Sequence, residues 1–506
     1  MKQGFRQSMA WLHTWAGLVT GWVMFCVFVT GTATYYRTDI SQWMRPELRA
    51  AAVEPGLAAE RGAAYLKVHA PKAVSWFVSV PQEDRPLIGV YWLDSFEAPI
   101  QQAMLDAETG APTTVRATHG GDFLYRFHYE LQIMPVLGRW IVGASALILL
   151  VALVSGIVTH RRIFSDFFTF RRDRSAQRGW LDAHNVTGVL ALPFHLMITY
   201  TGIVTLAFTL MPWGVASAYR GDELRFFVEA GQSPAWQAAT GRPAEALPLA
   251  PLMGRAQAEV SEPLEMVIVN NPGDAASTVV AVFEEPKGLA HRHPQIVFDA
   301  VSGAVINRLG TLKPAAHVFT SFLGLHEAHF AGPALRVLFF LCGVMGSATI
   351  ATGLVLWSVA RAPKPGTAAG FGLRLVRGLN LGTILGLPIG IAAFFLANRL
   401  LPVALDQRAT WEGGVFFAAW GGAAILGLLR PHDRTWREMG TAAALLFLAI
   451  PLVSAVTTDR GFDFVGFDAA MIAIGFALAW GARKVSRYRG SARARPAAAS
   501  KSLARA

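Results

Sequence analysis

The sequence of 506 residues is short of charge, since 16% of its residues are Asp, Glu, Lys or Arg and 53% are hydrophobic. A soluble protein of this length would carry more charge on its surface, so a soluble globular class is disfavoured. The net charge of +11 raises the possibility of a nucleic-acid partner. However, the basic residues form short clusters between apolar runs, which is typical of loops at a membrane, so no nucleic-acid partner is expected.

Cysteine is almost absent as well. Cys26 and Cys342 both lie in apolar runs, which predicts small buried packing residues and not a disulfide framework. The sequence also has no Walker loop, no nucleotide-binding glycine fingerprint after a strand and no HExxH motif. These missing patterns argue against the nucleotide-binding and zinc-protease classes that such motifs mark.

Long apolar segments are abundant, and eight of them are long enough to cross a hydrocarbon core of about 30 Å. The first follows Lys2 and Arg6 and resembles a signal peptide, but it is too long and no cleavage site follows it, so a retained helix is predicted. The eight segments are residues 12–36, 136–160, 184–211, 333–360, 372–398, 412–430, 437–457 and 465–482.

The positive residues predict the orientation of these spans. Residues 161–183, 361–378, 430–437 and the tail 483–506 are rich in Arg or Lys. The short loops between the other spans, 399–411 and 458–464, hold three positive residues between them. Both termini are therefore expected on the cytoplasmic side, as an even number of spans requires.

Two long polar insertions are expected to face the periplasm. Each mixes short β-like runs with turn signals, and each contains the motif D-A-x-[ST]-G, beginning at Asp106 and at Asp299. In such a turn Gly takes the positive φ and Asp bonds its own backbone. The fold class is therefore an all-α polytopic membrane protein of about eight spans with two small inserted α+β domains. The predicted parts are helix 1 (1–36), insertion 1 (37–135), helix 2 (136–160), a basic loop (161–183), helix 3 (184–212), insertion 2 (213–332), helix 4 (333–360), four further helices (371–482) and a basic tail (483–506).

An internal repeat organises the first half of the chain, because the unit of helix, insertion and helix occurs twice in one orientation. Parallel repeats usually relate by an axis along the membrane normal, which places equivalent residues at equal depth on facing helices. The last four spans show no such repeat and have no predicted role. The matched positions are His13 with His184, Gly17 with Gly188, Gly31 with Gly202, Arg139 with Arg336, and Gly156 with Gly353.

Histidines near the span ends are the candidate functional residues, because ionisable groups in a membrane are costly and rare. The other interpretation for each is an interfacial histidine bonded to a headgroup or a backbone carbonyl, but the repeat-matched positions favour ligands. Neutral imidazole suits haem iron. The candidates are His13, His160, His184 and His195 in spans or at cytoplasmic ends, and His128 and His326 just before spans two and four.

The pairing of these histidines has more than one solution. One prediction is that His13 and His184 bind one macrocycle from opposite sides as axial ligands. His128 and His326 are predicted to do the same for another. Alternatively, His184 and His195 are eleven residues apart, which is almost three whole helical turns, so they are expected to share a face about 16.5 Å apart and to serve two stacked haems. His195 is also a candidate to pair with His160, or with Met24, its equivalent position in the repeat.

Nearby polar groups have predicted supporting roles. Each imidazole needs a partner for its second nitrogen, and Asp182, Glu130 and Glu327 are the candidates. Arg139 and Arg336 are candidates to pair with haem propionates, although lone arginines at a helix end often merely snorkel. The spacing of His326 and His329 is a weak metal motif, and His291 and His293 are expected to be solvated.

Together these motifs resemble a known family. The first ~360 residues resemble the PepSY-associated transmembrane proteins, also called iron-regulated membrane proteins, and are similar to the ferrisiderophore reductases of Gram-negative inner membranes. The resemblance implies two PepSY-like domains, and one or two haems b on His13, His128, His160, His184, His195 and His326. The motifs that carry it are WLHTWAG, FHYEL, SGIVTHRR, DAHNVTGVLALPFHLMITYTG and GLHEAHFAGP.

The resemblance also implies an activity, the reduction of a ferric siderophore in the periplasm. The chain has no fused flavin and nicotinamide domain, so the electron donor is expected to be a quinol or a separate reductase. A hypothesis of another class is a non-redox regulator whose PepSY-like domains bind a periplasmic protease or envelope protein. A weaker third hypothesis is a transporter with His195 as a proton relay.

Overall fold

The computed structural model describes residues 4–48, 53–82, 85–113, 115–159, 176–364, 366–459 and 464–493. The chain divides into two compact units, each built from several segments. The first, which we call the helical unit, comprises Met1–Pro46, Arg116–Leu196 and Phe340–Ala506. The second, which we call the sheet unit, comprises Glu47–Val115 and Met197–Phe339.

Seven helices among the described residues are long and apolar enough to cross a membrane, and a bent helix pair provides an eighth candidate span. The prediction of about eight spans is therefore confirmed, and the protein is a multi-span membrane protein. The seven are α1 (Phe5–Thr34), α5 (Pro135–Thr159), α13 (Pro333–Ala360), α14 with α15 (Phe371–Ile384 and Gly386–Leu400), α16 (Arg408–Leu429), α17 (Asp433–Thr457) and the first part of α18 (Val465–Arg493).

The third span is broken, which corrects one prediction. It consists of α6 (Ala176–Leu190) and α7 (Leu192–Thr205), whose axes differ by 69°. Pro193 is the second residue of α7 and has no N–H to donate to the carbonyl of Val189, so the helix stops just before it. His184 and His195 therefore lie on different helices, and the predicted shared face with a straight-helix separation is wrong.

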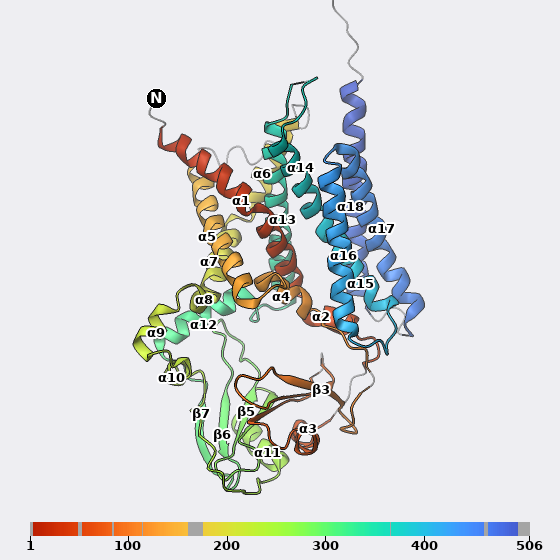
Figure 1. Ribbon diagram of the computed structural model, residues 1–506. Coiled ribbons are helices and arrows are strands. Elements are labelled where there is room, and N and C mark those ends of the chain that lie inside the picture. The colour runs from red at the N-terminus through yellow and green to blue at the C-terminus, as the bar shows by residue number, and fades with distance from the viewer. Residues whose placement is uncertain are drawn as a thin grey trace, which may run out of the picture. The chain divides into compact units, whose positions relative to one another are not determined.

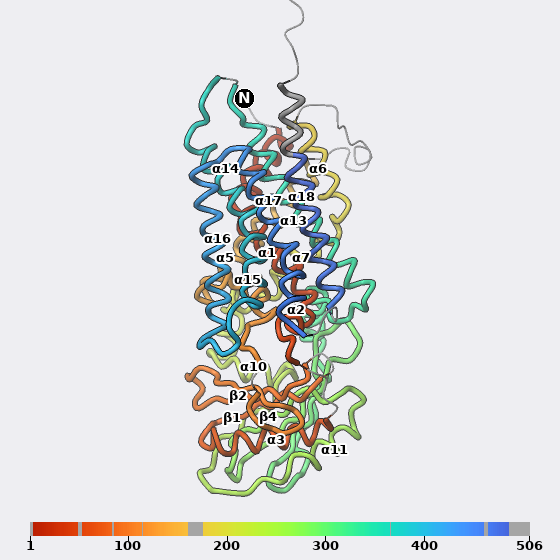
Figure 2. Tube along the Cα trace, turned by 90° about the vertical axis from the view of Figure 1, so that its right-hand side faces the viewer, coloured from red at the N-terminus to blue at the C-terminus, as the bar shows by residue number. Residues whose placement is uncertain are grey.

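The helices of the helical unit pack in two groups along the chain. α1 packs on α5 and on the short helix α4 (Asp122–Glu130), and Figure 1 shows α1 and α5 side by side. The four C-terminal spans pack as α15 on α16 and α17, α14 on α16, and α17 on α18. Figure 2 gives a second view of these helices, which are coloured from teal to blue. The short helix α2 (Arg37–Trp43) ends in Trp43, which is fully buried between Phe395 and Phe467.

The two predicted insertions form one continuous antiparallel sheet of seven strands in the order β3-β2-β1-β4-β5-β6-β7 (Figure 1). The first insertion supplies three strands and the second supplies four. The halves join through β1 and β4, where Phe77 pairs with Ile268. The strands are β1 (Ser75–Ser79), β2 (Leu87–Leu93), β3 (Gln101–Asp106), β4 (Leu264–Asn270), β5 (Thr278–Phe283), β6 (Gln295–Asp299) and β7 (Val305–Leu309).

One helix from each insertion, at equivalent positions in the repeat, completes the hydrophobic core of the sheet unit. α3 (Pro55–His69) packs on α11 (Leu249–Glu259) and on β1 and β2. Leu66 of α3 and Met253 of α11 are buried against Val78 and Val267 of the two joining strands. The sheet unit also contains α8 (Ala207–Leu210), α9 (Trp213–Tyr219), α10 (Glu223–Glu229) and α12 (Pro314–Glu327), together with most of α7 and the start of α13.

The two predicted turns are confirmed, and they match in detail. Asp106 Oδ1 accepts a hydrogen bond from the amide of Thr109 at 2.8 Å, and Asp299 Oδ1 accepts one from the amide of Ser302 at 2.7 Å. Gly110 and Gly303 have φ of 72° and 71°, which an L side chain rarely adopts. The repeat therefore extends into the sheet unit.

Candidate cofactor site

Two repeat-equivalent histidines meet inside the helical unit. The ring centroids of His13 on α1 and His184 on α6 are 6.1 Å apart, with an angle of 60° between the ring planes. Since an imidazole nitrogen lies about 2 Å from a bound metal, two rings that ligate one ion from opposite sides have centroids about 6 Å apart. The separation therefore suits a shared metal centre.

Both rings line one cavity of about 410 Å³. Its walls come from α1, α5, α6 and α13 and are mostly apolar, and they include the repeat glycines Gly17 and Gly188. Cavities of a few hundred cubic ångströms with apolar walls and few polar groups are typical cofactor sites. His13 and His184 supply the imidazole side chains among the residues that line this cavity.

A backbone carbonyl sets the tautomer of each ring. Nδ1 of His13 lies 2.8 Å from the carbonyl oxygen of Ala152, and Nδ1 of His184 lies 2.8 Å from that of Thr349. A carbonyl only accepts, so Nδ1 carries the proton and Nε2 keeps the lone pair that binds metal. At Nδ1 of His184 the carbonyl of Thr349 takes the place predicted for Asp182, whose carboxylate forms an ion pair with Arg178 at 3.2 Å.

A glycine lies directly against each ring. A Cβ built on Gly156 would be 3.1 Å from Cε1 and Nδ1 of His13, and one built on Gly353 would be 3.1 Å from Cε1 of His184. These contacts are tighter than ordinary van der Waals contact, so a side chain here would push on the ring. Gly156 and Gly353 are repeat equivalents, which explains why the sequence repeats them.

His128 has the same surroundings elsewhere in the helical unit. Its Nδ1 lies 2.8 Å from the carbonyl oxygen of Val27. A Cβ on Gly31 would be 2.5 Å from Cε1 and Nδ1 of the ring. The predicted partner Glu130 forms an ion pair with Arg139 instead, at 3.4 Å.

His326 repeats the arrangement inside the sheet unit. Its Nδ1 lies 3.0 Å from the hydroxyl of Thr201, which itself donates to the carbonyl of Met197 at 2.8 Å. A Cβ on Gly202 would be 2.9 Å from Cε1 of His326. The predicted partner Glu327 faces His291 and not His326. A tied Nδ1, an Nε2 lone pair and a closely packed ring are what an axial haem ligand needs.

His195 differs from these four. Its side chain is buried, and backbone groups of Gly188 and Cys342 lie within hydrogen-bonding reach of the ring. The ring packs edge-on against Phe28 at 6.2 Å, and Nε2 would be 3.2 Å from a Cβ on Gly346. A buried neutral imidazole can ligate a metal, so His195 stays a candidate.

The other predicted site residues are His160, Arg139 and Arg336. His160 lies outside the described residues. Arg139 pairs with Glu130 and lies 5.5 Å above the ring of Tyr129, so its guanidinium already has protein partners. Arg336 is in the first turn of α13. The propionate role of both arginines remains a prediction.

One group of residues was misjudged from the sequence. His291 and His293, expected to be solvated, contact buried or half-buried carboxylates of the sheet unit: Glu285 touches His291, and Glu265 lies 3.1 Å from His293. Burial raises the pKa of Glu285, but contacts with the imidazoles of His291 and His329 outweigh it and hold this pKa at about 2. The signal was the short spacing of histidines and glutamates in the loop 284–293.

Comparison with known proteins identifies the relatives of the chain. The family described as the PepSY-associated TM region matches residues 10–360. An uncharacterized protein of Pseudomonas aeruginosa is 29% identical to the chain over 336 residues, which cover 62% of this chain and 80% of that relative. The matched region ends with the last residue of α13 and includes all the candidate histidines.

Proposed function

The chain belongs to the family of PepSY-associated transmembrane proteins, and from this premise we propose that it is a haem-dependent electron-transfer protein of the bacterial inner membrane. Its activity is the reduction of ferric iron, held by a siderophore, on the periplasmic side. The electron donor is a quinol or a separate reductase.

The observation that carries the proposal is the pair His13 and His184, whose rings lie 6.1 Å apart at a cavity of about 410 Å³. Both rings present the same tautomer, and both rest on a glycine. Histidines that merely anchor a helix at a membrane surface would not need a glycine behind the ring. The arrangement is that of ligands held ready for a planar cofactor.

The chain's own residues would hold one or two haems b and control their surroundings. His13, His184, His128 and His326 are the proposed ligands, with His195 as the alternative. When bound, a haem supplies one-electron redox chemistry. The backbone carbonyls keep each Nε2 basic, and the apolar walls around His13 and His184 keep water away, both of which tune the reduction potential.

The electrons and protons of the proposed reaction balance. Each ferric ion takes one electron, whereas a quinol gives two electrons and releases two protons, so one quinol reduces two ferric ions. The smaller charge of Fe(II) weakens its bonds to the hard oxygens of a siderophore. Reduction therefore favours iron release.

A reduced-minus-oxidised absorption spectrum of the purified protein tests the proposal. We expect a b-type signal in the wild type and its loss or reduction in His13→Ala and His184→Ala. His69→Ala is the matched control, since this exposed histidine also has Nδ1 against a carbonyl, that of Tyr65 at 2.8 Å, but does not line the cavity of His13 and His184. A colourless, folded wild type would contradict the proposal and favour the non-redox regulator.

A further inference from the structure

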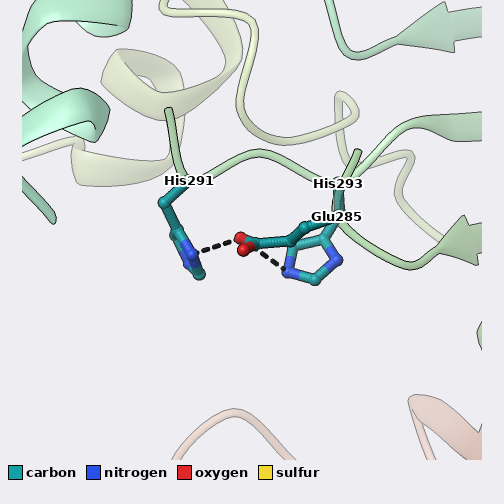
Figure 3. A group of neighbouring side chains, drawn as sticks. All are labelled: Glu285, His291 and His293. Atoms are coloured by element: carbon teal, nitrogen blue, oxygen red, sulfur yellow. Dashed lines mark ion pairs between the residues drawn. The ribbon is translucent and has the colours of Figure 1, made fainter. Parts of the chain in front are cut away.

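A second cluster of metal-ligating side chains lies within the sheet unit. Glu285, His291 and His293 come from the loop between β5 and β6, and Figure 3 shows the carboxylate of Glu285 between the two imidazoles. Glu327 is the last residue of α12, and His329 follows two residues later. These residues form two overlapping sets that share His291, and in each set the ligand atoms lie within 4.8 Å of one another.

The separations within the cluster suit a single ion. Nδ1 of His329 lies 2.9 Å from Oε2 of Glu285, and Nε2 of His293 lies 3.5 Å from Oε1 of Glu285. Oε2 of Glu327 lies 3.6 Å from Nδ1 of His291. Donor atoms that are each about 2.1 Å from one ion in a tetrahedron lie about 3.4 Å apart. These three distances bracket this value, whereas the direct contact between Glu285 and His291 is closer and would open when an ion binds.

Two buried atoms face each other at the centre of the cluster. Oε1 of Glu285 and Nδ1 of His291 are in direct contact, and neither has a hydrogen bond to any other group among the described residues. Buried polar atoms in proteins are almost always well satisfied. A cation that both atoms bind, in place of this direct contact, would satisfy both.

The surrounding structure holds the ligands in place. The amide of His291 donates to the carbonyl of Thr320 on α12 at 3.0 Å. This close approach requires Gly324, because a Cβ there would lie 1.8 Å from the carbonyl oxygen of Leu289. Oε2 of Glu265 lies 3.1 Å from Nδ1 of His293 and leaves Nε2 to face Glu285. A carboxylate behind a ligating histidine is a common feature of metal sites.

We propose that this cluster binds one divalent first-row transition metal ion, through His291, His293, Glu285, Glu327 at the end of α12 and His329 just after it. The donors are imidazole nitrogens and carboxylate oxygens without sulfur, a set that suits Zn²⁺, Fe²⁺ and related ions. The carboxylates supply negative charge, and the histidines are partly exposed, so the ion has a route from solvent.

This site is independent of the proposed haem function, because none of its residues is a proposed haem ligand. It has a structural link to that function nonetheless, since Glu327 directly follows His326 on α12. If both proposals hold, the helix that presents a haem ligand also presents a ligand to the ion.

Metal content and affinity test the inference on the full chain, purified without a polyhistidine tag and stripped with a chelator. We expect one equivalent of Zn²⁺ by elemental analysis and a saturable isotherm by calorimetry, with anaerobic Fe²⁺ as the second probe. Glu285→Gln and His293→Ala should each weaken Zn²⁺ binding by about 100-fold or more, beyond the 10- to 100-fold that loss of an outer partner costs. X-ray absorption at the zinc edge should show imidazole scattering in the wild type.

The controls separate this inference from the function proposed above. His317→Ala removes an exposed histidine from the same helix and should bind Zn²⁺ like the wild type. His184→Ala should lose haem but keep Zn²⁺, whereas His293→Ala should keep its haem spectrum. Zn²⁺ binding that is absent from the wild type, or unchanged in both Glu285→Gln and His293→Ala, would overturn the inference.

Discussion

At the scale of single residues, four of the candidate histidines share one local arrangement, namely His13, His128, His184 and His326. Nδ1 of each of the four is held by a carbonyl or, for His326, by a hydroxyl. A glycine from another helix touches each ring. Neither feature lies near its histidine in sequence, yet both decide which nitrogen can bind metal and where the ring stands.

Gly31→Ala is therefore expected to disturb the His128 ring. Its Cβ would lie 2.5 Å from two ring atoms, which no real Cβ contact tolerates, so the imidazole must move and the bond from its Nδ1 to Val27 is strained. We expect a shifted or diminished b-type spectrum, read by absorption. Gly421→Ala is the control, because a Cβ there has nothing within 4 Å. Identical spectra for both variants would contradict the role of Gly31.

Asp274 gives a prediction for pH at the same scale. Hydrogen bonds from the amides of Ala276 and Thr240 hold its pKa at about 2, below the usual 3.8. Because the folded-state pKa is depressed, its stabilising contribution is complete above about pH 4 and is lost as the pH falls through 2. We expect Asp274→Ala to lower the thermal unfolding temperature of the sheet unit at pH 7 but not near pH 2. A difference that is constant over this range would contradict the prediction.

At the scale of elements, a buried polar network joins the C-terminal helices to the rest of the helical unit. Arg408 and Glu412 of α16 form an ion pair, and both side chains are fully buried. Glu412 also accepts from Asn398 of α15 at 2.8 Å and from the hydroxyl of Thr118. Arg116 donates to the carbonyl of Asn398 at 2.7 Å. Specific buried contacts thus hold the four C-terminal spans against the rest of the helical unit.

Glu412→Ala should destabilise the protein by about 3–5 kcal/mol, because it leaves the Arg408 guanidinium buried without its carboxylate. Glu438→Ala is the control: it breaks an exposed ion pair with Arg430 at 3.2 Å, which should cost less than about 1 kcal/mol. The free energy of unfolding in detergent, titrated with a denaturing surfactant, measures both. Equal costs would show that the buried pair is not a structural link.

At the scale of the whole molecule, the internal repeat has different consequences in its two parts. In the sheet unit it joins the halves into one sheet through β1 and β4. In the helical unit it brings His13 and His184 together. The family match ends at residue 360, and the spans beyond it were the part of the sequence without a predicted role.

The sequence by itself determined the spans, the repeat, the paired Asp-Gly turns and the set of candidate histidines. Those features are local, because hydrophobic length, turn chemistry and spacing depend on nearby residues. Only the tertiary structure decided the partners: carbonyls in place of Asp182 and Glu130, glycines behind the rings, and the meeting of Glu285 with His291 and His329. These contacts join residues far apart in the chain, and packing, which no local pattern encodes, brings them together.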